Sequence, residues 1–93
     1  MSEDVRWKQR FENFEKAYQF LKESVALGHY DKLQQAGLVQ SFEFTFELAW
    51  KTAKDYLESM GVSVPYPRLV IKEAFQAGLI DDGHLWMKML DKR

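Results

Sequence analysis

The chain has 93 residues, of which 46% are hydrophobic and 15% aromatic, and its 13 basic and 14 acidic residues give a net charge of −1. This balance provides no electrostatic basis for strong attraction to nucleic acid or to a membrane surface, and without cysteine there are no disulfides and no thiolate sites. A chain of this length forms one domain, 1–93, with a core that is marginal without a partner or a second copy. No signal peptide or membrane span is apparent, so we expect a cytoplasmic protein.

The first third of the chain carries apolar residues at alternating spacings of four and three, which is a helical stripe. The stripe consists of Trp7, Phe11, Phe14, Tyr18, Leu21 and Val25. It predicts a helix from about Asp4 to Leu27 that buries this side, with Phe20 and Leu27 widening the buried face. Gly28 is a suitable left-handed residue after the helix.

The segment SFEFTFELAWKTAKDYL, residues 41–57, alternates like a strand at first and then takes helical spacing. No glycine, proline or turn signal separates its two halves, so we interpret it as one helix. The helix is expected to end at Met60 and to begin at either Lys32 or Leu38, because Gly37 leaves the start open. One broad apolar face is expected to be core: Val39, Phe42, Phe46, Ala49, Trp50, Ala53, Tyr56, Leu57 and Met60. Phe44 and Leu48 form a second apolar stripe, which is typical of a central bundle helix or of an interface.

The last third of the chain reads as a loop and two shorter helices. GVSVPYP, residues 61–67, is the loop, and Pro67 suits the first turn of a helix that extends to about Ala77. The apolar side of this helix is formed by Val70, Ile71, Ala74, Phe75 and Ala77. Gly78 ends it, and Asp81 or Asp82 caps a fourth helix that continues to Arg93. The expected fold is all-α: an antiparallel up-and-down bundle whose last helix is cut short.

Few side chains suggest chemistry. We expect His29 and His84 to have solvent or capping roles, and Asp81 and Asp82 to cap a helix. Glu43 and Glu47 lie four residues apart and share a helix face, which is most simply a solvated face, although a pair of carboxylates could also bind a metal or an arginine. No phosphate loop and no spacing of a nucleophile with a base is present, so neither a cofactor nor a metal is predicted.

Three blocks of the sequence are more specific than an amphipathic pattern. They are RFENFEKA (10–17), GLVQSFEFTFELAWKTAKDYLESMGV (37–62) and PRLVIKEAFQAGLIDDGHLWMKMLDKR (67–93). Together they closely resemble the nucleotidyltransferase substrate-binding protein family, whose members have the HEPN-type helical bundle. The resemblance covers nearly the whole chain.

The resemblance implies a four-helix bundle that forms a homodimer and associates with a minimal nucleotidyltransferase subunit, which carries the catalytic residues. It implies binding of nucleotide or RNA only through that complex, and no membrane partner. It also places Glu43, Glu47, Lys51 and Arg93 at the binding cleft, and Phe44, Leu48 and Trp86 at a dimer or partner interface. Where the family often has a serine that caps the third helix, this chain has Tyr66, so the N-terminus of that helix should be less stable.

Related pairs act as toxin–antitoxin modules, in which the HEPN subunit is a ribonuclease that its nucleotidyltransferase neutralises by transferring AMP to a tyrosine. Arg93 matches the arginine of the family's ribonuclease motif, but the motif's histidine and the acceptor tyrosine do not follow in this sequence. Since cleavage needs both basic groups, we expect a non-catalytic binding subunit. The alternatives are a ribonuclease toxin whose C-terminal histidine segment is missing here, and a degenerate product without activity.

Overall fold

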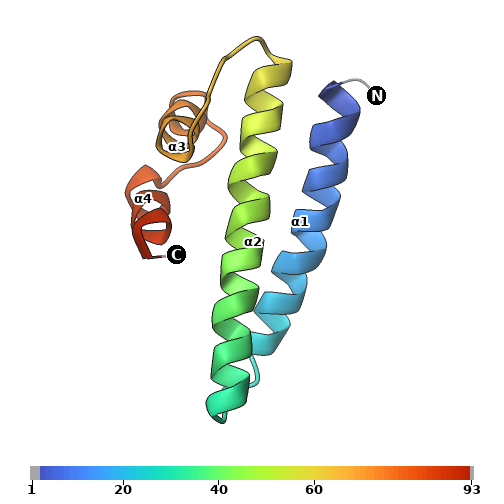
Figure 1. Ribbon diagram of the computed structural model, residues 1–93, viewed down its shortest axis with the longest axis vertical. Helices are drawn as coiled ribbons and strands as arrows, with labels where there is room; N and C mark the ends of the chain where they lie inside the picture. Colours follow the sequence, from blue (N-terminus) through green and yellow to red (C-terminus); the bar gives the residue numbers. More distant parts are fainter. Residues whose placement is uncertain (1–2, 93) are drawn as a thin grey trace.

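The computed structural model describes residues 3–92, with side chains from residue 6 onward. These residues form four helices, α1 (Glu3–Val25), α2 (Lys32–Ser59), α3 (Pro67–Gln76) and α4 (Gly83–Lys92). The long helices α1 and α2 run antiparallel, and α3 and α4 lie beside the C-terminal half of α2, on the side away from α1 (Figure 1). The predicted all-α bundle is confirmed.

Local hydrogen bonds explain where α2 begins. The Gln34 amide donates to Asp31 Oδ1 at 2.7 Å, and the Asp31 amide donates to Gln34 Oε1 at 2.9 Å. This capping box satisfies backbone donors that would otherwise lack a partner. The helix therefore begins at Lys32, the first of the two predicted starts, and Gly37 lies inside it. Asp31 is a cap that the sequence pattern did not indicate.

Two glycines end α2 and α3 in the predicted manner. Gly61 and Gly78 have φ of +86° and +78°, a region that favours glycine. After α3, the Leu79 amide donates to the Ala74 carbonyl at 2.9 Å and the Gly78 amide to the Phe75 carbonyl at 3.1 Å. These are the two bonds of a Schellman motif. They direct the chain back toward α2, where α4 begins.

The core lies between the C-terminal half of α2 and α3. Leu57 on α2 packs with Val70 and Ala74 on α3, and the residues around them are Trp50, Ala53, Val62, Leu69 and Ile80. Val64, which the sequence analysis had placed in a loop, is 0% exposed and belongs to this core. Tyr66 provides no side-chain cap for α3, as expected, so α3 is held mainly by burial of its apolar side.

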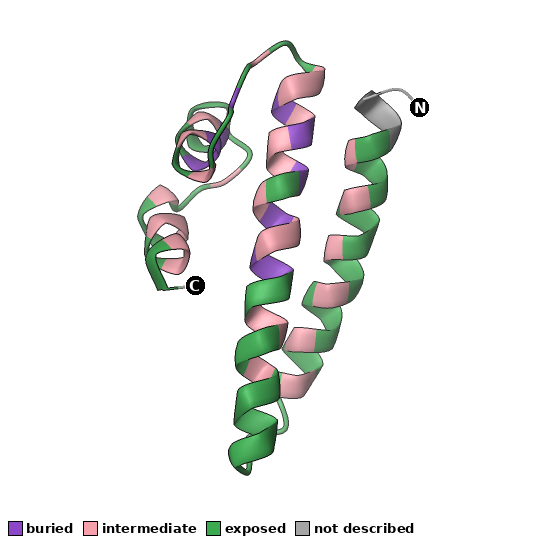
Figure 2. Ribbon diagram, viewed as in Figure 1, coloured by how far each residue is buried: buried purple, intermediate pink, exposed green. Residues whose placement is uncertain are grey.

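The other long helix, α1, packs against α2 through a narrower contact than predicted. None of its described side chains is fully buried, and the half-buried ones are Trp7, Arg10, Phe14, Ala17, Leu21 and Ser24. Three residues of the predicted stripe, Phe11, Tyr18 and Val25, remain 42%, 49% and 55% exposed. The prediction that the whole stripe is buried was wrong, because α1 contacts one long helix and can bury only the side that faces it (Figure 2).

Six further apolar residues were wrongly predicted to be buried. The exposed ones are Val39 on α2 and Met60 at its C-cap, Phe20 on α1 and Leu27 just after it, and Phe75 on α3 and Ala77 at its C-cap. Val39 lies in the N-terminal half of α2, beyond the reach of the short helices α3 and α4, and Met60 lies at the end of α2 (Figure 1). Burial in this fold therefore follows the position of α3 and α4 along α2 as well as helical periodicity.

A buried carboxylate lies at the contact between α1 and α2. Asp55 is 6% exposed, and its Oδ2 lies 3.1 Å from Arg10 Nη1. The same oxygen accepts no hydrogen bond from the described residues, so Arg10 balances its charge by proximity rather than by a well-aligned bond. The sequence did not indicate this pair, because its two residues are far apart in the chain.

Replacing Arg10 tests how much the contact between α1 and α2 depends on its ion pair with Asp55. We expect Arg10→Met to lower the free energy of unfolding by about 2 kcal/mol, because an unpaired buried charge is costly and Arg10 is only partly buried. Adding Asp55→Leu should recover most of the loss, since no charge then remains buried. Urea unfolding of both variants is the measurement, and a double variant less stable than the single one would contradict it.

The role of the loop in the core can be tested separately. Val64→Ala should lower the free energy of unfolding by about 2 kcal/mol, because it leaves a cavity at a fully buried site. Val39→Ala removes the same atoms from an exposed helical site and should change stability by less than about 0.5 kcal/mol. Similar losses for the two variants would show that Val64 does not belong to the core in solution.

Candidate binding surface

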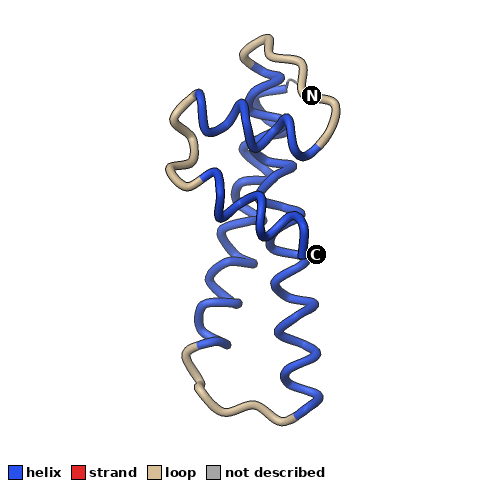
Figure 3. The backbone as a smooth tube through the Cα atoms, turned by 90° about the vertical axis from the view of Figure 1, so that its left-hand side faces the viewer, coloured by secondary structure: helices blue, strands red, loops and turns tan. Residues whose placement is uncertain are grey.

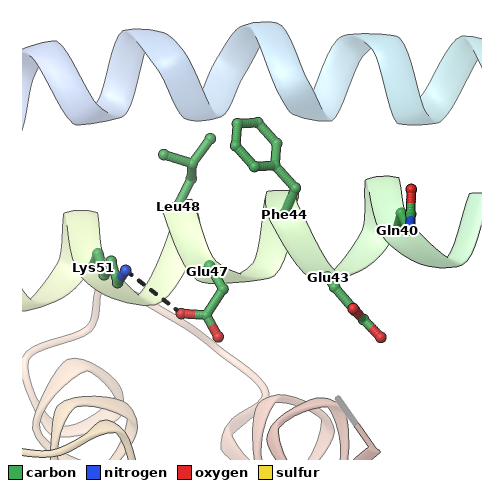
Figure 4. Close-up of a pocket in the computed structure, with 6 residues that line it drawn as sticks. All are labelled: Gln40, Glu43, Phe44, Glu47, Leu48 and Lys51. Atoms are coloured by element: carbon green, nitrogen blue, oxygen red, sulfur yellow. Dashed lines mark ion pairs between the residues drawn. The ribbon is translucent and has the colours of Figure 1, made fainter.

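An open hollow on α2 brings together most of the residues that the sequence singled out. Its volume is about 690 Å³, and it is lined by Gln40, Glu43, Phe44, Glu47, Leu48 and Lys51. All six belong to α2 and recur at intervals of three and four residues, so the helical repeat alone places them on neighbouring faces. Figure 4 shows the arrangement.

The side chains divide into an apolar and a charged part. Phe44 and Leu48 point toward α1, whereas Glu43 and Glu47 extend away from it (Figure 4). Phe44 is 62% exposed, and Leu48 is half-buried. The second stripe predicted from the sequence therefore exists, and α1 covers only part of it.

Glu47 is the most constrained charged group in the hollow. Its Oε2 accepts a hydrogen bond from Trp50 Nε1 at 2.9 Å and lies 3.8 Å from Lys51 Nζ. The Lys51 ammonium also lies 5.9 Å from the centre of the Trp50 ring, within the range of a cation–π contact. Glu47 and Lys51, four residues apart on α2, thus form an ion pair along the helix. Glu43 is exposed and makes no ion pair within residues 3–92.

A second hollow adjoins the first on the side of α1. Its volume is about 600 Å³, and it shares Gln40, Phe44 and Leu48 with the first hollow. Its other lining residues are Asn13, Lys16, Ala17, Phe20, Gly37 and Ser41. We call the two hollows together the Phe44 surface. Phe20 was predicted to be buried because it is apolar. The sequence does not show that no other helix covers this side of α1.

Trp86, the third predicted interface residue, lies elsewhere. Its ring is 5.8 Å from that of Phe46, so part of it packs within the chain. It also lines a separate hollow of about 370 Å³ between α1, α2 and the segment that leads into α4. That hollow shares no lining residue with the Phe44 surface: its walls are Trp7, Phe11, Phe14, Ala49, Thr52, Ala53, Tyr56, Leu79, Ile80 and Trp86. The prediction for Arg93 falls outside the described residues.

A comparison with protein families shows which family this chain belongs to. The family described as nucleotidyltransferase substrate binding protein like matches residues 9–93. The chain belongs to this family. A search of curated proteins found no match. The family match covers every residue of the Phe44 surface and the whole of α2, α3 and α4, so the resemblance inferred from the sequence is confirmed.

The remaining candidate groups of this family member have simpler roles. Asp82 Oδ1 accepts a hydrogen bond from the Leu85 amide at 3.0 Å and so caps α4, as predicted. His29 and His84 are exposed. Within the described part of the chain, no three His, Asp or Glu side chains are grouped to hold a metal ion. None of the described helices has the length and apolar character required to cross a membrane.

The contacts of Glu47 give a prediction for this surface. Glu47→Ala should lower the free energy of unfolding by about 1 kcal/mol, because the Trp50 indole loses its acceptor. Lys51→Ala should change it by less than about 0.5 kcal/mol, since exposed ion pairs contribute little. Urea denaturation of the two variants measures the difference, and an equal effect would mean that Glu47 acts mainly through Lys51.

Proposed function

We propose that this protein is the substrate-binding subunit of a nucleotidyltransferase complex and that the Phe44 surface docks the nucleotidyltransferase. The family match supports the first part. The observation that carries the second is an apolar centre left exposed on a helix between charged and amide side chains, at residues that the family match covers. Interfaces between proteins commonly combine an apolar centre with a polar rim.

The side chains of this surface suit binding rather than catalysis. Glu47 is engaged by Trp50 and Lys51, and the polar groups around the hollow are amides, carboxylates and ammonium groups. We therefore propose that the nucleotidyltransferase supplies the chemistry and that this subunit is non-catalytic. Glu43 and Lys51 at the edge of the surface would contact the substrate, a nucleotide or RNA held by the complex in the cytoplasm.

We also propose that the protein forms a homodimer. Phe11, Tyr18 and Val25 on α1 and the residues of the hollow beside Trp86 do not line the Phe44 surface, so a second copy and a nucleotidyltransferase would occupy different surfaces. The alternative, a HEPN ribonuclease toxin, depends on Arg93, and no contact among the described residues favours it.

Docking through the Phe44 surface can be tested with one substitution. Phe44→Glu should weaken binding to the nucleotidyltransferase of the proposed complex by at least about thirtyfold, because a charge replaces an aromatic group at the centre of the interface. Its fold should be unaffected, since Phe44 is exposed. Isothermal titration calorimetry with the two purified proteins is the measurement.

The matched control is Val39→Glu, which places the same charge at another exposed apolar site on α2 that lines neither part of the Phe44 surface. It should leave the affinity unchanged. Equal binding by the Phe44→Glu variant and the unsubstituted protein would reject this surface as the docking site.

A further inference from the structure

The exposed side of α1 has a regular pattern that its packing on α2 does not use. Phe11, Tyr18 and Val25 are spaced by seven residues and remain about half exposed. The rings of Phe11 and Phe14 are 6.3 Å apart, and those of Phe14 and Tyr18 are 5.9 Å apart. We call this row, with the neighbouring Phe14 and Leu21, the α1 seam. A seam with a seven-residue repeat fits another helix that has the same repeat.

A second row with the same repeat borders the seam. Lys8, Glu15 and Lys22 are also spaced by seven, are exposed, and alternate in charge. Neither Glu15 nor Lys22 makes an ion pair within residues 3–92. In paired helices, charged residues beside the apolar row determine which partner and which register are favoured.

From this pattern we infer that α1 packs antiparallel against α1 of a second copy, with Glu15 facing Lys22 across the two-fold axis. The inference rests on the homodimer proposed above and specifies its interface. A symmetric interface must match its own surface, and the α1 seam does so because its apolar row and its charged row repeat at the same interval.

The charges select one register. If Tyr18 lies beside Leu21 of the second copy, then Phe14 lies beside Val25 of the second copy. Glu15 is then displaced from Lys22 of the second copy by two residues, or about 3 Å along the helix. Moving the pairing by one heptad would instead bring Glu15 beside Glu15 of the second copy in one direction, or Lys22 beside Lys22 in the other, and both are repulsive.

In the same register, a side chain of the second copy reaches the hollow near Trp86. Phe14 is part of the wall of that hollow, so Val25 of the second copy would reach its edge. No charged side chain lines this hollow, as expected for a surface that takes an apolar residue. One antiparallel contact would therefore cover both the seam and the adjoining end of the hollow.

Charge exchange tests this arrangement. Glu15→Lys and Lys22→Glu should each weaken the dimer by on the order of tenfold, because each change replaces two attractions with two repulsions. Mixed in equal amounts, the two single variants should form a heterodimer in preference to either homodimer, since every charge then faces its opposite. Sedimentation velocity and native mass spectrometry give the dissociation constants and the composition of the dimers.

Two variants act as controls for charge and for folding. Glu12→Lys makes the same charge change at an exposed site of α1 outside both rows and should leave the dimer unchanged. Tyr18→Glu, in the middle of the seam, should give a folded monomer by circular dichroism and sedimentation.

The results separate this inference from the proposed function. A wild-type protein that remains monomeric at every concentration would overturn it. A dimer unaffected by both charge variants, or a mixture without preference for the heterodimer, would also overturn it while leaving the homodimer itself in place. Binding of the nucleotidyltransferase, measured with the Phe44→Glu variant, is independent of all these outcomes.

Discussion

The structure depends on the burial of the C-terminal half of α2, which packs against α1 on one side and against α3 on the other (Figure 1). Leu57 faces α3 and the Val64 loop, while Thr52 and Asp55 face α1 and are also buried. Because α3 and α4 are short, they cover this half and no more (Figure 3). The N-terminal half of α2 extends past them with only α1 alongside, which explains why Phe44 on this half is exposed.

Part of the burial along α2 is polar. Thr45 and Thr52 are buried there, and their hydroxyl groups donate to the carbonyl oxygens of Ser41 and Leu48 on the same helix. Small residues that satisfy their own hydrogen bonds allow close approach while adding little apolar burial. In the contact between the long helices, Asp55 pairs with Arg10, and the ring of Trp7 on α1 meets the ring of Tyr56 on α2 edge-on, with 5.0 Å between their centres. Phe11, Tyr18 and Val25 of the α1 seam stay exposed because α2 covers a different side of α1.

Much of the fold follows from local sequence signals. The glycines after α2 and α3, the Asp82 cap and the order of four helices depend on chemistry within a few residues, and all were predicted correctly. The errors concern contacts between residues that are distant in the sequence. The sequence did not show which of two adjacent heptad rows on α1 faces α2, nor that Val64 belongs to the core. Periodicity indicates an apolar side but gives no information about how many neighbours a helix has. The first hollow was predictable for the same reason as the helices, since its six lining residues share α2. The second hollow was not, because Phe20 and its neighbours on α1 line it together with residues of α2.

Two apolar surfaces remain exposed on this domain because its core is small. A chain of 93 residues buries a smaller fraction of its surface than a larger domain does, and here α1 packs mainly against one neighbour, α2. Several of the exposed apolar residues lie on two surfaces: Phe20 and Phe44 on the Phe44 surface, and Phe11, Tyr18 and Val25 on the α1 seam. The charges of the Phe44 surface are partly engaged within the chain, through Glu47 and Lys51. The charged row beside the α1 seam repeats at heptad spacing, which favours a partner with the same spacing. Assembly would thus complete for α1 the two-sided burial that α2 already has.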